Sequence, residues 1–118
     1  MIILHTRSME ILNAVTEIAG KLGEEVYMIS ESSLEHTMRK YYDGKDTMAI
    51  VRIPSDYVMP DILVFSKMED EKVDRFLMAY KNTGARQVEL KVVLTKRNFS
   101  WSVYELIEDT KRQRRLYI

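Results

Sequence analysis

Polar and cationic residues follow each of the four apolar runs in this sequence. They are His5, Thr6 and Arg7 after the first run, Ser30 after the second, Ser66 and Lys67 after the third, and Thr95, Lys96, Arg97 and Asn98 after the fourth. If the runs are parallel strands of one sheet, their carboxyl ends meet at one edge, where ligands bind beside helix N-termini. Hydroxyl, amide and cationic groups at that edge suit a phosphate or a carboxylate. The candidate anion-binding residues are Lys67, Thr95, Lys96, Arg97 and Asn98.

A structural role competes with anion binding at the same residues. Ser, Thr and Asn side chains accept hydrogen bonds from the first turn of a helix, so they are common where a strand leads into one. Lys and Arg on loops are usually solvated. Because these roles account for all five residues, we expect no saturable binding of millimolar phosphate.

Known catalytic arrangements are largely missing from the sequence. Neither G-x-G-x-x-G nor G-x-x-x-x-G-K occurs, and four scattered glycines cannot build a phosphate loop. The two histidines, His5 and His36, have no second His or carboxylate at metal-ligand spacing. His5 is the one candidate for a general base, and a hydrogen-bonded structural His is the competing explanation. We therefore expect a protein that is not an enzyme and uses no metal or cofactor.

The composition is typical of one globular domain. The chain has 118 residues, of which 46% are hydrophobic and 31% charged, and its net charge is zero. Zero net charge argues against bulk nucleic-acid binding, and the cationic tail at 111–115 is explained by the dipole of a last helix. The lack of cysteine suits a reducing cytoplasm. The short apolar run at 2–4 predicts neither a signal peptide nor a membrane span.

Hydrophobic periodicity predicts four strands and three helices. The strands are 2–4, 26–29, 62–65 and 88–94, and the helices are 8–22, 69–83 and 101–114. The first and third strands are apolar throughout, which is typical of central strands covered on both faces. The last strand alternates like an edge strand, with Glu89 and Lys91 on one face and Val88, Leu90, Val92 and Leu94 on the other.

Signals for helix ends support these boundaries. Ser66 with Glu69, and Ser102 with Glu105, have the spacing of capping boxes. Gly23 and Gly84 stand where a left-handed residue would end a helix. Trp101 is expected to be the first residue of the last helix and to close the end of the core.

Two tandem strand-helix-strand units explain the order of elements. Residues 2–4 match 62–64, and the helical stripe that starts at Leu12 matches the one that starts at Val73. The predicted fold is therefore a single α/β domain with a mostly parallel four-stranded sheet, strand order 2-1-3-4, and helices on both faces. A ferredoxin-like α+β fold is the alternative, with the second and third strands antiparallel. Residues 1–42 form the first unit, 43–60 a connection with "MAIVRI" as a candidate extra strand, and 61–118 the second unit with the last helix.

The second half of the chain resembles a known family. The residues that carry the resemblance are "LVFS" at 63–66, "DRFL" at 74–77, "LKVVLT" at 90–95, Asn98 and Trp101. This pattern, over roughly 61–115, is similar to that of small bacterial proteins grouped as domain of unknown function, family 3783. The resemblance implies no activity, because the family has none assigned. The chain departs from the family after Ser66, where Lys67, Met68 and Glu69 replace a Gly, an aromatic residue and a Ser.

We expect a noncatalytic cytoplasmic domain that acts through protein association, and through self-association first. Eight Met and seven Tyr are many for this length and suit an adaptable contact surface. The expected homodimer uses the last helix and "LYI" at 116–118. The alternative is a binding module for a small anionic ligand or nucleic acid at the strand ends.

Overall fold

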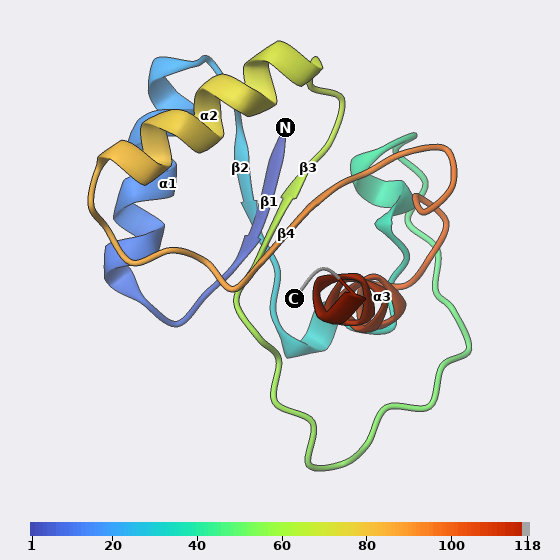
Figure 1. Cartoon of the computed structure of the whole chain (residues 1–118). Helices are drawn as coiled ribbons and strands as arrows, with labels where there is room; N and C mark the ends of the chain where they lie inside the picture. Colours follow the sequence, from blue (N-terminus) through green and yellow to red (C-terminus); the bar gives the residue numbers. More distant parts are fainter. Residues whose placement is uncertain (117–118) are drawn as a thin grey trace.

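The computed structural model describes residues 1–116 as one domain built around a single sheet (Figure 1). In chain order, its main elements are β1 (Ile2–His5), α1 (Met9–Lys21), β2 (Val26–Met28), β3 (Ile62–Phe65), α2 (Asp70–Asn82), β4 (Leu90–Val93) and α3 (Val103–Leu116). Two short 3-10 helices, η1 (Glu31–Ser33) and η2 (Met38–Tyr41), follow β2. The predicted α/β class is confirmed. In the described part of the chain, no helix is long and apolar enough to cross a membrane.

The strands lie in the predicted order, β2-β1-β3-β4. β1 pairs in parallel with β2, and β3 pairs in parallel with β4. The central pair of β1 and β3 is antiparallel, with Leu4 opposite Leu63 and His5 opposite Ile62. Most pairings are therefore parallel, as predicted, but the two strand-helix-strand units run in opposite directions. The ferredoxin-like alternative required β2 to pair with β3, and β1 lies between them.

The antiparallel centre decides which face each helix covers. A half-turn about an axis perpendicular to the sheet relates the two units, so crossovers of the same hand place both helices on one face. Figure 1 shows this arrangement, with α1 and α2 together on one side of the sheet. The other face is covered by α3 and by residues 30–60. The prediction of helices on both faces is thus confirmed, with α1 and α2 on one face and α3 on the other.

Each face of the sheet has its own apolar core. The core under α1 and α2 includes Leu4, Ile11, Phe65, Phe76 and Tyr80. The core under α3 includes Ile3, Leu90, Leu94, Leu106 and Ile107. Val88 belongs to the first core, so the prediction that it shares a face with Leu90 is wrong. Alternation holds only within a strand, and β4 begins at Leu90.

The connection at 43–60 forms one isolated bridge, between His36 and Met48, and no strand. The prediction of an extra strand at "MAIVRI" is therefore wrong. A strand needs a neighbouring backbone to bond with, and an apolar pattern alone does not supply one. The side chains of Met48, Ile50 and Val58 are exposed on this segment.

The predicted end signals hold for most helices. Gly23 and Gly84 both have φ of 71°, as residues that end a helix in the left-handed region do. Ser102 and Glu105 form the predicted capping box, with the Glu105 N–H 3.0 Å from Ser102 Oγ and the Ser102 N–H 3.2 Å from Glu105 Oε1. Because this box starts α3 at Val103, Trp101 lies before the helix and is not its first residue.

Candidate functional site

The strand ends do not gather at one edge of the sheet, because β1 and β3 are antiparallel. His5, Thr6 and Arg7 follow β1, and Ser30 follows β2, so these four residues lie at one edge. Ser66 and Lys67 follow β3, and the turn at 95–98 follows β4, so these residues lie at the opposite edge. The prediction of one polar edge shared by all four strands is wrong. The five candidate anion-binding residues do remain on the same edge.

The residues after β1 are engaged in structural contacts. His5 is 5% exposed, and its Nδ1 lies 2.8 Å from the carbonyl oxygen of Pro60. Thr6 Oγ1 accepts a hydrogen bond from the Ser8 N–H, and Ser8 caps α1. Arg7 forms an ion pair with Glu31. Within residues 1–116, no three His, Asp or Glu side chains are placed to share a metal ion.

The turn after β4 uses its own polar groups. Asn98 Oδ1 accepts a hydrogen bond from the Thr95 N–H at 2.8 Å, and Asn98 Nδ2 donates to the Val93 carbonyl at 3.2 Å. Thr95 Oγ1 accepts a hydrogen bond from the Arg97 N–H at 3.2 Å. The guanidinium of Arg97 lies over the ring of Trp101, 5.8 Å from its centre. Thr95 and Asn98 therefore act as turn residues, while Lys96 and Arg97 are exposed.

Lys67 lines a different hollow from the turn at 95–98. Its hollow is formed by the end of α1 and the start of α2, with Lys21, Glu24, Glu69, Lys72 and Arg75 around it. Glu24 is a partly buried carboxylate there, with 11% of its side chain exposed, and it forms ion pairs with Lys72 and the N-terminal ammonium. Burial alone would raise the pKa of Glu24, but the hydrogen bonds from Lys72 and the ammonium outweigh it and lower the pKa. The structure thus separates Lys67 from the other candidate anion-binding residues.

Ser66 does not cap α2. Its side chain is fully buried and donates a hydrogen bond to the carbonyl of Tyr41. The N-cap of α2 is Glu69, which makes no side-chain capping bond. The predicted Ser66–Glu69 box is therefore wrong, because the chain makes a further turn at Lys67 before the helix begins.

The backbone of Lys67 is strained. Its φ is 56°, and in the described residues it is the one non-glycine residue with positive φ. A side chain in this left-handed region crowds the following carbonyl, which glycine avoids. We expect Lys67→Gly to raise the free energy of unfolding by about 0.5–1 kcal/mol in urea titrations followed by circular dichroism.

Lys67→Ala is the matched control for this prediction. It removes the same charge but keeps the Cβ atom, so it should give none of the gain. A gain of equal size in Lys67→Ala would assign the effect to charge and contradict the strain.

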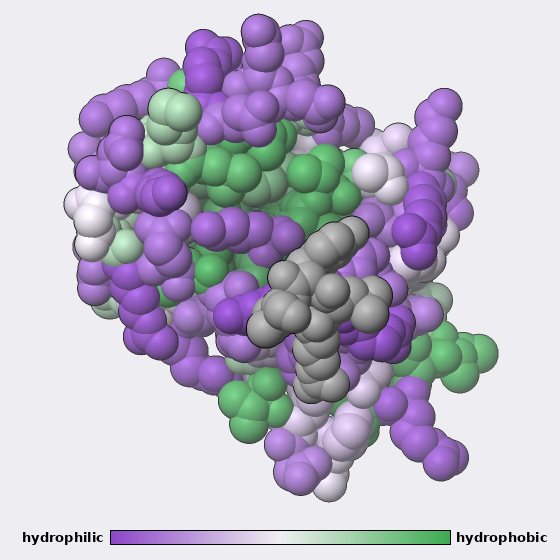
Figure 2. All heavy atoms as spheres, viewed as in Figure 1, coloured by the Kyte–Doolittle hydropathy of each residue, from purple (hydrophilic) through white to green (hydrophobic). Residues whose placement is uncertain are grey.

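A groove runs along the free edge of β4. It has a volume of about 390 Å³, and its walls are Val73 and Leu77 of α2 on one side and Asp109 and Gln113 of α3 on the other. Its floor includes Lys91, Val92 and Val93 of β4. Figure 2 shows hydrophobic side chains exposed between α2 and β4, with hydrophilic residues around them. The groove therefore combines one apolar wall from α2 and one polar wall from α3 with the backbone of an edge strand.

The middle of the β4 edge has backbone groups that face away from the sheet. The N–H groups of Leu90 and Leu94 donate to the backbone carbonyls of Asp61 and Phe65. The backbone N–H and C=O groups of alternate residues point the same way, so those of Val92 also point toward β3. Lys91 and Val93 consequently present their N–H and C=O groups to the outside, and the carbonyl of Glu89, the residue before β4, faces the same way. Arg114 Nη1 bonds the Glu89 carbonyl at 3.2 Å, and Asn98 bonds that of Val93. Among residues 1–116, both backbone groups of Lys91 face the groove without a hydrogen bond.

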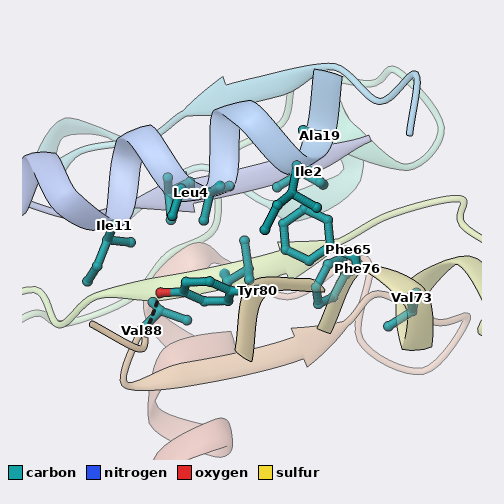
Figure 3. Packing of buried hydrophobic residues seen from close by; sticks show 13 residues of the cluster. Ile2, Leu4, Ile11, Ala19, Phe65, Val73, Phe76, Tyr80 and Val88 are labelled. Carbon is teal, nitrogen blue, oxygen red and sulfur yellow. Dashed lines mark hydrogen bonds between the residues drawn. The ribbon is translucent and has the colours of Figure 1, made fainter. Parts of the chain in front are cut away.

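Tyr80 holds the chain that leads into β4. Its hydroxyl donates to the Arg86 carbonyl at 2.6 Å and accepts from the Val88 N–H at 2.9 Å. Figure 3 shows the Tyr80 hydroxyl beside Val88. The Lys91 ammonium lies 5.6 Å from the centre of the Tyr80 ring. Partial burial of the Lys91 ammonium, and then the nearby positive charge of Lys81, lower the pKa of Lys91 below its ordinary value. The start of β4 is thereby fixed from inside the core.

Sequence reasoning missed this groove. The helical stripe predicts Val73 and Leu77 as core residues, and Val73 is indeed 6% exposed, whereas Leu77 is only partly buried. The last strand is the edge strand that its alternation predicts. One signal was present: Val92 and Val93 are consecutive apolar residues, which breaks the alternation and leaves Val93 on the outer side. Val93 is indeed 37% exposed.

Comparisons with known proteins match the second half of the chain. A search of curated proteins and a search of solved structures each gave no match. The described part of the matched region contains β3, α2, β4 and α3, and hence the whole groove. Residues 61–117 match the family described as Domain of unknown function (DUF3783), which confirms the resemblance predicted from the sequence.

Proposed function

We propose that the protein is a noncatalytic association domain whose contact surface is the open edge of β4. The observation that carries this proposal is the outward-facing N–H and C=O pair of Lys91 on the floor of the groove. An exposed strand edge is a ready template for another extended segment, which bonds to it as an additional strand. The apolar wall from Val73 and Leu77 and the polar wall from Asp109 and Gln113 would give such a segment side-chain contacts beyond the backbone bonds.

The last helix adjoins the proposed contact surface. Asp109 and Gln113 of α3 form one wall of the groove. The expected contribution of "LYI" at 116–118 includes residues 117 and 118, which lie outside the described residues. We therefore place the contact on β4 and the adjoining faces of α2 and α3.

Anion binding and catalysis have less support from the contacts. The side chains of Thr95 and Asn98 already bond the turn that would have to receive an anion. Lys67 lines a separate hollow. His5, the candidate general base, has one ring nitrogen held by the Pro60 carbonyl. Strand addition uses groups that are free, and so it fits the geometry better.

The proposal is tested by mapping where partners bind. Unlabelled full-length chain, and ten-residue peptides selected on it from a random display library, are titrated into the ¹⁵N-labelled chain. We expect saturable amide shifts at 89–93 and at Val73 and Leu77. Binding that maps only to other surfaces, or no binding of either titrant at millimolar concentration, would contradict the proposal.

Two substitutions at one position separate backbone pairing from side-chain contact. Lys91→Pro removes the outward N–H, and it spares the β3–β4 ladder because that N–H points away from β3. Lys91→Ala removes the side chain and keeps the N–H. For the selected peptides, we expect binding about tenfold weaker in the proline variant and a change of less than about threefold in the alanine variant.

A further inference from the structure

We propose that a second copy of this chain occupies the groove, with the two β4 strands paired antiparallel about a two-fold axis at Leu90. This inference rests on the proposed function and names its partner. Antiparallel pairing of identical edges gives a closed dimer, whereas parallel pairing leaves no symmetric closure. The two four-stranded sheets then form one continuous sheet.

Few alignments of the two edges allow hydrogen bonding. Lys91 and Val93 carry outward N–H and C=O groups and Glu89 carries an outward C=O, so only these residues can form hydrogen bonds across the interface. An axis at Leu90, Lys91 or Val92 pairs at least two of these residues, whereas an axis at Glu89 or Val93 pairs only one residue with its own copy. These three alignments place different charges opposite each other.

Charge complementarity selects the alignment centred on Leu90. It places Glu89 of each copy opposite Lys91 of the other, which gives two opposite-charge pairs related by the axis. The alignment centred on Lys91 places the two lysines directly opposite, and like charges in that position are destabilising. The alignment centred on Val92 places Lys91 opposite Val93 and leaves the charges unmatched.

The charged groups are free to make these pairs. Glu89 contacts Arg114 at 3.5 Å, and both side chains are about half exposed, at 52% and 54%. Lys91 Nζ lies 3.2 Å from the Gln87 side-chain oxygen, also in an exposed contact. The Glu89 carbonyl has a second lone pair beside the bond from Arg114. A strand partner can therefore bind without breaking a buried interaction.

The opposite edge of the sheet lacks this complementarity. In β2, the Ile29 N–H bonds Leu4 and the Glu25 carbonyl bonds Ile2, so Val26 and Met28 present the outward groups. Both side chains are uncharged and offer no pair that fixes an alignment. Tyr27 and Met28 are nevertheless exposed, at 39% and 49%, which makes β2 the rival dimer surface.

A charge exchange between two full-length variants tests the alignment. In Glu89→Lys, lysines at 89 would face Lys91, and in Lys91→Glu, glutamates at 91 would face Glu89. By sedimentation velocity over 10 µM to 1 mM, each variant alone should dimerise about tenfold or more weakly than the parent chain. An equimolar mixture of the two variants should form a heterodimer within about threefold of parental affinity, because all pairs are again opposite in charge.

Lys96→Glu is the matched control, because it makes the same charge change on the exposed turn beside the groove. It should leave the dimer affinity unchanged. A parent chain that stays monomeric at 1 mM, a dimer unaffected by both single reversals, or a mixture that fails to associate would each overturn the two-fold pairing. Peptide binding at 89–93 would still support the proposed function in those cases, so the two failures can be told apart.

Discussion

Replacing Phe76 by alanine should lower the free energy of unfolding by about 3–5 kcal/mol. Phe76 is fully buried between α2 and the sheet. Its ring meets that of Phe65 edge-on, with centres 5.3 Å apart, and lies 6.4 Å from that of Tyr80 (Figure 3). Alanine would leave a cavity, because the rigid rings of Phe65 and Tyr80 cannot move in to fill the space. Urea unfolding followed by circular dichroism measures the loss.

Phe76→Leu keeps the prediction testable if the alanine variant does not fold. Leucine retains most of the apolar volume, so its loss should be about 1–1.5 kcal/mol. Phe65 also lines the groove, so the alanine variant should in addition broaden or shift amide signals along β4. A loss below about 1 kcal/mol in Phe76→Ala would contradict the central role of this ring.

Tyr80→Phe should cost about 2–3 kcal/mol, although it removes a single oxygen. That oxygen bonds both the Arg86 carbonyl and the Val88 N–H. Val88 is 4% exposed, so water cannot replace the lost partner of its N–H. An unsatisfied buried donor bears the full desolvation cost. The same urea titration measures the change in stability.

Hydrogen exchange separates this effect from a general loosening of the core. The Val88 amide should exchange markedly faster in Tyr80→Phe, whereas amides of α1 should follow only the global stability. Tyr27→Phe is the control, because the Tyr27 side chain is exposed, and its cost should stay within about 0.5 kcal/mol. Equal losses of unfolding free energy in the two variants would show that the hydrogen bonds of the Tyr80 hydroxyl do not stabilise the fold.

These two residues connect the core with the proposed contact surface. Tyr80 fixes the chain just before β4, and Phe76 supports α2, which forms one wall of the groove. An edge strand that is held rigidly loses little conformational entropy when a second strand is added. The same contacts that stabilise the fold therefore keep the β4 edge ready for pairing.

The sequence by itself determined most elements of this protein and favoured their order in the sheet over the ferredoxin-like alternative. Period and composition along a few consecutive residues mark strands and helices, and the continuous apolar runs of β1 and β3 require cover on both faces, which makes them central. The Ser102–Glu105 box and the two left-handed glycines were predictable for the same reason: each depends on residues three or four positions apart. The resemblance of the second half to the DUF3783 family was likewise readable from short motifs.

Only the tertiary structure decided the direction of β3 relative to β1. That direction is set by the path of a connection with no strand of its own, and a local pattern carries no information about it. Because β1 and β3 are antiparallel, the polar residues that follow the strands lie at opposite ends of the sheet, and α1 and α2 lie on the same face. The same arrangement left the β4 edge between α2 and α3, where Val73, Leu77 and Val93 face a groove. Their side chains are apolar in either environment, so only the packing of distant segments shows which of them remain available for a partner.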